Sequence, residues 1–84
     1  MLQKNYNRRY ACEQIDREVE KIKNEYPYKY YGYSKYDQLL VDSAEVQIII
    51  GNDKAALELL DKCFAGSSLI EVWEQAAEET QYDY

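Results

Sequence analysis

The chain has 84 residues, enough for one domain with a single hydrophobic core, and we expect that domain to cover residues 1–84. Its hydrophobic content of 46% is too high for a disordered chain, and 31% of charged residues is ordinary for a globular protein. No apolar run approaches the roughly 18 residues of a membrane span, and no signal-peptide core follows Met1. We therefore expect a cytoplasmic protein without membrane contact.

Charge is distributed unevenly along the sequence. Residues 1–36 hold eight Lys or Arg and five Asp or Glu, whereas residues 37–84 hold two Lys and eleven Asp or Glu, which gives a net charge of −6. The sign changes at the end of a tyrosine-rich segment, residues 26–36, which holds six of the ten tyrosines. Nucleic acid is a poor partner for such a chain, because phosphate contacts with basic residues dominate that affinity.

The residue types exclude most metal sites. The chain has two cysteines and no histidine, whereas a structural zinc site needs four Cys or His ligands. Cys12 and Cys63 each fall on the apolar stripe of a predicted helix, where a reduced cysteine acts as a small hydrophobe. We expect two buried thiols, no metal and no cofactor, with a disulfide between the two cysteines as the alternative.

Apolar residues recur at three- and four-residue steps over residues 3–25, which predicts an amphipathic first helix. Pro27 disfavours helix at the residue before it and so ends this helix. Leu2, Tyr6 and Tyr10 fall on the opposite side of the helical wheel. Either the first turns bend away, or the helix has a second apolar face. The inward stripe consists of Ala11, Cys12, Ile15, Val19 and Ile22.

The tyrosine-rich segment has no clean period and is interrupted by Gly32, which favours an ordered loop over a strand. Ser34, followed three residues later by Asp37, is typical of a capping box, so a second helix is expected to begin directly after the serine. Apolar residues cover most of its wheel up to Ile50, which is typical of a helix in the middle of a bundle. The alternative is a short strand over residues 46–50, because β-branched side chains favour sheets.

Two further helices are predicted. Asn52 follows a glycine and is typical of a helix cap, and apolar residues at helical spacing continue from there to about Phe64. Gly66 is expected to close this third helix, and Ser68 with Glu71 to form the capping box of a fourth. The third and fourth helices should make an antiparallel hairpin, and the whole chain a compact all-α bundle of about four helices. The inward stripe of the fourth helix consists of Leu69, Val72, Trp73, Ala76, Ala77 and Thr80.

The sequence gives little support for catalysis. A serine or cysteine nucleophile needs a base, and the usual base, histidine, is absent. Ser67 and Ser68 lie where a helix cap is expected, and capping explains them. Glu78 and Glu79 are adjacent and point apart on a helix, so they make no acid–base pair. We expect a non-enzymatic protein, with acid–base chemistry by carboxylates or tyrosines of shifted pKa as the alternative.

Two groups of residues remain as candidate binding surfaces. Acidic side chains of the fourth helix and the tail lie away from its inward stripe, and they form either a solvated face or an anionic surface that docks on a basic one. Tyrosines of the central segment either anchor a partner or lay their rings over the core. The acidic group consists of Glu71, Glu74, Glu78, Glu79 and Asp83, and the tyrosine group of Tyr28, Tyr30, Tyr31 and Tyr33.

A short, acidic, tyrosine-rich helical chain of this size resembles the counter-defence proteins of bacteriophages, of which anti-CRISPR proteins are the best-known group. Residues 52–60 together with residues 68–74 are also similar to the helical hairpin of small proteins from phages and mobile elements. The resemblance implies a protein-binding inhibitor in the cytoplasm of a bacterial host cell. Its target would be a host defence protein such as a CRISPR effector, whose basic nucleic-acid channel it would occupy.

The leading hypothesis from the sequence is therefore an inhibitor whose tyrosines anchor a basic protein surface while its carboxylates guide association. The rival hypothesis is a small structural or regulatory homo-oligomer, such as a homodimer. Its self-interface would consist of Leu2, Tyr6, Tyr10 and Ile49.

Overall fold

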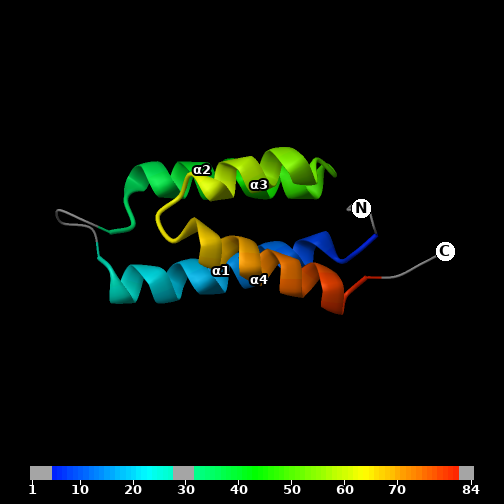
Figure 1. Cartoon of the computed structure of the whole chain (residues 1–84), viewed down its shortest axis with the longest axis horizontal. Helices are drawn as coiled ribbons and strands as arrows, with labels where there is room; N and C mark the ends of the chain where they lie inside the picture. Colours follow the sequence, from blue (N-terminus) through cyan, green and yellow to red (C-terminus); the bar gives the residue numbers. More distant parts are fainter. Residues whose placement is uncertain (1–4, 28–31, 82–84) are drawn as a thin grey trace.

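The computed structural model describes residues 5–27 and 32–81, and it confirms the all-α fold. Its four helices are α1 (Arg8–Glu25), α2 (Lys35–Ile49), α3 (Asp53–Asp61) and α4 (Gly66–Glu79). Consecutive helices run in opposite directions, with α1 and α4 in one layer and α2 and α3 in the other (Figure 1). The contacts of α1 with α2 and of α3 with α4 close this ring into an up-and-down bundle.

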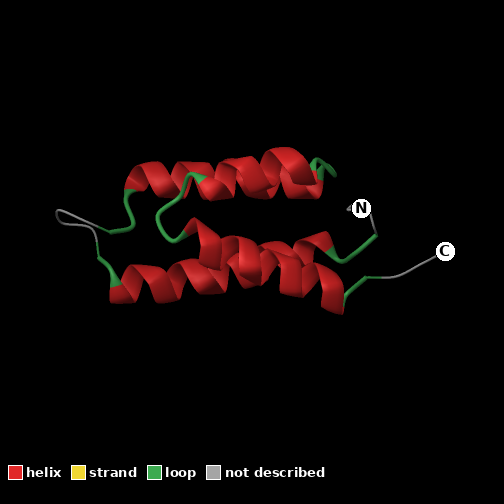
Figure 2. Ribbon diagram, in the orientation of Figure 1, coloured by secondary structure: helices red, strands yellow, loops and turns green. Residues whose placement is uncertain are grey.

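Helices hold most of the described chain, and short loops join them (Figure 2). Within residues 5–27 and 32–81, no helix is both long and apolar enough to cross a lipid bilayer.

α1 begins at Arg8, later than residue 3, because Asn7 caps it. The Asn7 side chain accepts a hydrogen bond from the backbone N–H of Tyr10 at 2.9 Å, as expected of an N-cap. Tyr6 therefore precedes the helix and turns into the core instead of continuing the helical wheel. For Tyr6, the alternative in which the first residues bend away is correct.

The ends of the tyrosine-rich segment are held together, although residues 28–31 lie outside the described part. The backbone N–H of Tyr33 donates to the carbonyl oxygen of Tyr26 at 3.1 Å, beside an isolated parallel bridge between Pro27 and Tyr33. Gly32 has a φ of 143°, and a Cβ atom at this position would collide with the Tyr26 carbonyl oxygen. Glycine is required here by both its backbone conformation and its lack of a side chain.

The capping box predicted at the start of α2 is present. The Ser34 hydroxyl accepts from the Asp37 N–H at 3.3 Å, and the Asp37 carboxylate accepts from the Ser34 N–H at 2.8 Å. α2 continues to Ile49, so the alternative of a strand over residues 46–50 is wrong. The intact helical hydrogen bonds outweigh the β preference of the branched side chains there.

The prediction that this helix lies in the middle of the bundle is also wrong. α2 occupies one corner, in contact with α1 and α3, and makes no contact with α4 among the described residues. A ring of four helices has no central position, so a helix that is apolar all round exposes one face. Its inner face contains Leu40, Val41, Ala44 and Ile48, and its exposed apolar residues are Tyr36, Leu39, Val46, Ile49 and the C-cap residue Ile50.

The turn between α3 and α4 differs from the prediction. Gly66 is the first residue of α4 instead of the end of α3, and Ser68 forms no cap, since the N-cap position belongs to Ala65 in a left-handed conformation with φ 58°. A Cβ atom on Gly66 would collide with the carbonyl oxygen of Leu60. The close approach of the two helices therefore explains the glycine. The antiparallel hairpin itself is confirmed.

The core confirms most of the predicted stripes. All five inward residues of α1 are buried, and on α4 Leu69, Trp73, Ala76 and Ala77 are buried, whereas Val72 and Thr80 are half-buried. Cys12 and Cys63 are buried and unpaired, which confirms the expectation of two thiols.

One end of the bundle is closed by a buried polar network around Asp53, the first residue of α3. Its Oδ1 atom accepts from Arg8 Nη1 at 2.7 Å and from the Tyr6 hydroxyl at 2.9 Å. Trp73 Nε1 donates to the Tyr6 hydroxyl at 3.0 Å, and Arg8 Nη1 also donates to the carbonyl oxygen of Ile48 at 2.8 Å. Burial raises the pKa of Tyr6 to about 12, so its hydroxyl keeps the proton that it donates. The network thus joins the chain before α1 to the other three helices.

A second carboxylate, Asp37, holds the opposite end together. Besides capping α2, its Oδ1 atom accepts from the backbone N–H of Phe64 at 3.0 Å, in the turn between α3 and α4. Burial raises the pKa of Asp37, but hydrogen bonds from the N–H groups of Ser34 and Phe64 and from the Ser34 hydroxyl outweigh it, so the pKa lies below the ordinary value of an aspartate. The ionised form is the one that these hydrogen bonds stabilise.

We predict that Arg8→Met lowers the free energy of unfolding by about 3 kcal/mol, because it leaves the Asp53 carboxylate buried without a cation. Arg9→Met is the matched control: Arg9 is exposed on the next position of the helix, and its loss should cost less than about 0.5 kcal/mol. Urea unfolding followed by the fluorescence of Trp73, the only tryptophan, measures both. Equal losses in the two variants would contradict the role of the network.

We also predict that Asp37→Ala lowers the free energy of unfolding at pH 7 by about 2 kcal/mol, through loss of the cap and of the Phe64 hydrogen bond. Because the folded pKa is depressed, this stabilisation is present above the unfolded pKa of about 3.9 and is lost as pH falls through the folded pKa. Thermal unfolding between pH 7 and pH 2 should therefore show the difference shrinking with acid. Glu58→Ala, at an exposed carboxylate of α3, is the control, and a difference that stays constant down to pH 2 would refute the assignment.

Candidate functional site

The outer side of α4 carries charges of one sign only. Four glutamates are exposed there, and α4 contains no Lys or Arg that could neutralise them. Among the described residues none of them belongs to an ion pair. Glu79 accepts one long hydrogen bond of 3.4 Å from the Tyr10 hydroxyl. We call this surface the acidic face: it consists of Glu71, Glu74, Glu78 and Glu79, as predicted, whereas Asp83 lies outside the described residues.

A shallow groove extends the acidic face toward α3. It is lined by Asp61, Ser67, Ile70, Glu71 and Glu74. Asp61 therefore adds a carboxylate from a second helix, although no role was predicted for it. Its position beside Glu71 depends on the tight α3–α4 turn, which the capping pattern did not indicate.

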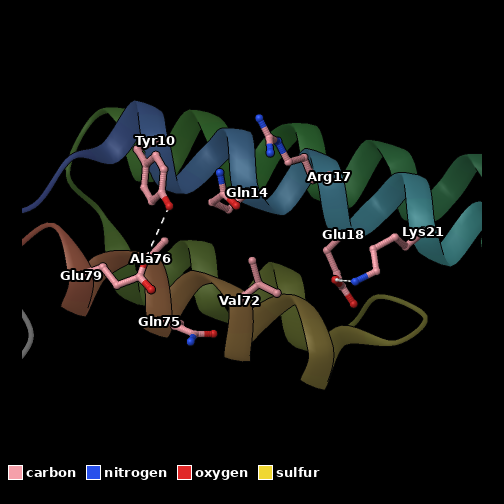
Figure 3. Close-up of a pocket in the computed structure, with 9 residues that line it drawn as sticks. All are labelled: Tyr10, Gln14, Arg17, Glu18, Lys21, Val72, Gln75, Ala76 and Glu79. Carbon is pink, nitrogen blue, oxygen red and sulfur yellow. Dashed lines mark hydrogen bonds and ion pairs between the residues drawn. The ribbon is translucent and has the colours of Figure 1, made fainter.

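A second groove lies between α1 and α4 (Figure 3). Tyr10 and Glu79 point toward each other at one end of it, and Glu18 pairs with Lys21 on α1 at 3.7 Å near the other end. Val72 lies between them and gives the groove an apolar patch. Both signs of charge and several amides line it, so it has no single preference for an anion or a cation.

The predicted tyrosine anchors are not supported as a group. Tyr28, Tyr30 and Tyr31 lie outside the described residues, so their role stays a prediction. Tyr33 is wrong as an anchor, because only 5% of it is exposed and its hydroxyl donates to Gln38 Oε1 at 3.0 Å. Its ring covers the core, which was the alternative for this residue.

The residues of the predicted self-interface do not form one exposed surface among the described residues either. Leu2 lies outside the described residues, and Tyr6 is wrong as an interface residue because its ring packs edge-on against Trp73 with 5.9 Å between centroids. Tyr10 is half-buried against α4. Of the four residues, Ile49 is described as exposed.

The cysteines are poorly suited to nucleophilic catalysis. Burial raises the pKa of Cys12 to about 12 and that of Cys63 to about 11, and the carboxylates of Glu45 and Asp37 respectively add to the effect. Both thiols are therefore protonated at neutral pH, and the thiolate is the reactive form. Ser67 is exposed and Ser68 half-buried at the start of α4. Within the described ranges, no three His, Cys, Asp or Glu residues are grouped as a metal site would require.

One carboxyl group has an unusual environment. Burial raises the pKa of Glu45 to about 9, and a hydrogen bond with the Asp16 carboxyl and the negative charges of Asp16 and Asp42 add to this. Glu45 Oε2 is buried without a hydrogen-bond donor from the described residues. Glu45 therefore holds a proton to higher pH than an ordinary carboxyl group, and it lies beside Cys12 and Ile49 in a groove at the end of α2.

Comparison with protein-family models, curated proteins and solved structures finds no match for this chain.

We predict that Glu45→Gln stabilises the protein as pH rises. The folded state binds the Glu45 proton more tightly than the unfolded state, so the stability of the wild-type chain falls as pH rises from about 4.5 toward 9. The glutamine amide of the variant does not titrate, so the variant avoids this loss of stability. Because the group is only half-buried, screening by water limits the expected gain at pH 8 to about 1 kcal/mol. Urea unfolding at pH 5 and pH 8 measures it, with Glu58→Gln on the exposed side of α3 as the control. A gain that is equal at the two pH values would contradict the shifted pKa.

Proposed function

We propose that the chain is a non-enzymatic protein-binding module that inhibits a larger partner by docking its acidic face on a basic surface. The observation that carries this proposal is the cluster of four exposed glutamates on a helix without a basic residue. Elsewhere the charges are mixed: on α1 five basic and five acidic residues alternate, and two carboxylates pair with lysines there.

The spacing of the carboxylates favours a particular kind of basic surface. Glu71 to Glu79 spans about 12 Å of helix axis, which gives one charge in about 4 Å. One strand of DNA carries a charge about every 3.4 Å, whereas the duplex carries one about every 1.7 Å. The acidic face therefore matches the charge density of a single phosphate backbone over a short length, and Asp61 widens it. A protein surface that binds single-stranded nucleic acid is the best complement.

The resemblance to phage counter-defence proteins supplies the class of partner. It would be a nuclease of a host defence system, such as a CRISPR effector, in the cytoplasm of a bacterial cell. Tyr28, Tyr30 and Tyr31, which lie outside the described residues, remain in the proposal as aromatic anchors. Tyr33 is not one of the proposed anchors, because its ring is buried and its hydroxyl is hydrogen-bonded to Gln38.

A homo-oligomer is the second candidate. It is favoured by a specific observation, the exposed apolar side of α2, which shares only Ile49 with the predicted self-interface.

We expect the immobilised chain to capture a basic protein from a bacterial lysate, and the captured protein to be eluted by raising salt from 50 to 500 mM. Salt screens the attraction between exposed charges across an interface, and the screening length is about 10 Å at 0.1 M salt. Electrostatic docking therefore weakens as the ionic strength rises. The triple variant Glu71→Gln, Glu74→Gln, Glu78→Gln should capture at least tenfold less.

The matched control is the triple variant Glu13→Gln, Glu25→Gln, Glu58→Gln, at exposed positions of α1 and α3, which changes the net charge by the same amount. It should capture as much as the wild-type chain. Equal losses in both triple variants would show that net charge alone matters, and capture that is insensitive to salt and to the α4 substitutions would refute the proposed site.

A further inference from the structure

The outer side of α2 carries a regular apolar stripe. Tyr36, Leu39, Val46 and Ile50 are each between 57% and 67% exposed. They follow one another in steps of three, seven and four residues, and Ser43 occupies the missing position of this heptad-like pattern. We call these five positions the α2 stripe.

The bundle itself leaves this stripe uncovered. α2 contacts α1 and α3 through its opposite side, where Leu40, Val41 and Ala44 are buried. The exposed apolar area of the stripe together with Ile49 is roughly 500 Å², at the upper end of what monomeric proteins show in one patch. Such a patch on a small chain marks an interaction surface.

We propose that a second copy of this chain covers the α2 stripe, with the two α2 helices antiparallel across a two-fold axis at Ser43. A two-fold interface needs a surface that complements itself. Read from either end, the stripe presents two large residues, one small residue and two large residues. An antiparallel copy therefore sets Tyr36 against Ile50 and Leu39 within one residue of Val46, while the two small serines allow the helices to approach.

The area is sufficient for a specific complex. Two stripes, each with its Ile49, together offer about 1,000 Å² of apolar surface, the lower size limit of specific interfaces before any neighbouring residue is counted. The spacing of the stripe over residues 36–50 covers four turns of helix, the length of a short antiparallel coiled-coil contact.

Charge also favours a second copy on this side. Each chain carries a net charge of −6, and its acidic face lies on α4, which does not contact α2 within the described residues. Two chains joined through α2 therefore keep their most acidic helices apart.

Sedimentation equilibrium between 1 and 100 µM tests the assembly. The wild-type chain should be a dimer with a dissociation constant in the low micromolar range, and Val46→Glu or Leu39→Glu should raise that constant at least 100-fold. Gln75→Glu adds the same charge at an exposed position of α4 and should change it less than threefold. Circular dichroism confirms that each variant is folded, which is expected because the substituted side chains are exposed.

A wild-type chain that is monomeric at 100 µM overturns the proposal, as does a Val46→Glu variant that is folded and still dimeric. If the chain is monomeric and Val46→Glu instead abolishes capture of another protein from lysate, a different partner covers the stripe and the proposal is likewise wrong. These outcomes are independent of the proposed function, because the α2 stripe and the acidic face share no residue.

Oxidative cross-linking tests the orientation. Ser43→Cys should form a disulfide with its own copy, and a mixture of Tyr36→Cys and Ile50→Cys chains should form a mixed disulfide. The natural thiols of Cys12 and Cys63 are buried and do not interfere. Glu58→Cys on the exposed side of α3 is the control that should not cross-link. Self-linked Tyr36→Cys chains without the mixed product would indicate parallel helices and overturn the antiparallel arrangement.

Discussion

A single buried carboxylate determines how one end of this bundle is assembled. An ionised group inside a protein is tolerated only when a cation and hydrogen-bond donors surround it. For Asp53 those groups come from distant parts of the sequence: the Arg8 guanidinium, the Tyr6 hydroxyl and, through that hydroxyl, the indole of Trp73. The chain before α1, the start of α3 and the middle of α4 must therefore meet at one point. Apolar packing alone would leave the sliding of one helix along another far less restricted.

Two buried aspartates also mean that part of the net negative charge does not lie on the surface. Asp53 and Asp37 belong to the acidic half of the sequence, yet both are buried and serve the two ends of the bundle. The remaining charge on the surface is still unevenly distributed. α1 carries equal numbers of both signs, whereas α4 carries glutamates alone. Acidity and exposed apolar surface consequently lie on different corners of the bundle, since α4 and α2 do not touch within the described ranges.

The helices could be predicted because their signals are local. The apolar period of α1, the Ser34–Asp37 capping box and the Asn52 cap each depend on residues within one or two turns. The errors have long-range causes. Tyr6 is buried because its hydroxyl reaches partners 47 and 67 residues away, and no spacing in the sequence reveals such a pair. The acidic face was predictable from the helical wheel of α4. The position of Asp61 beside it was not, because it depends on the left-handed backbone conformation of Ala65, which is unfavourable for an alanine.

The error about α2 is the most informative. The apolar pattern around most of the helix was identified correctly, but a central position in the bundle was the wrong explanation for it. A helix that is apolar on all sides needs apolar neighbours on all sides. Four helices in a ring supply them on one side only, and an 84-residue chain has no further helix to add within the described residues. The second apolar face of α2 therefore has no use inside the chain. Selection for folding alone would favour polar residues there, and the proposed contact with another copy of the same helix would account for the apolar residues.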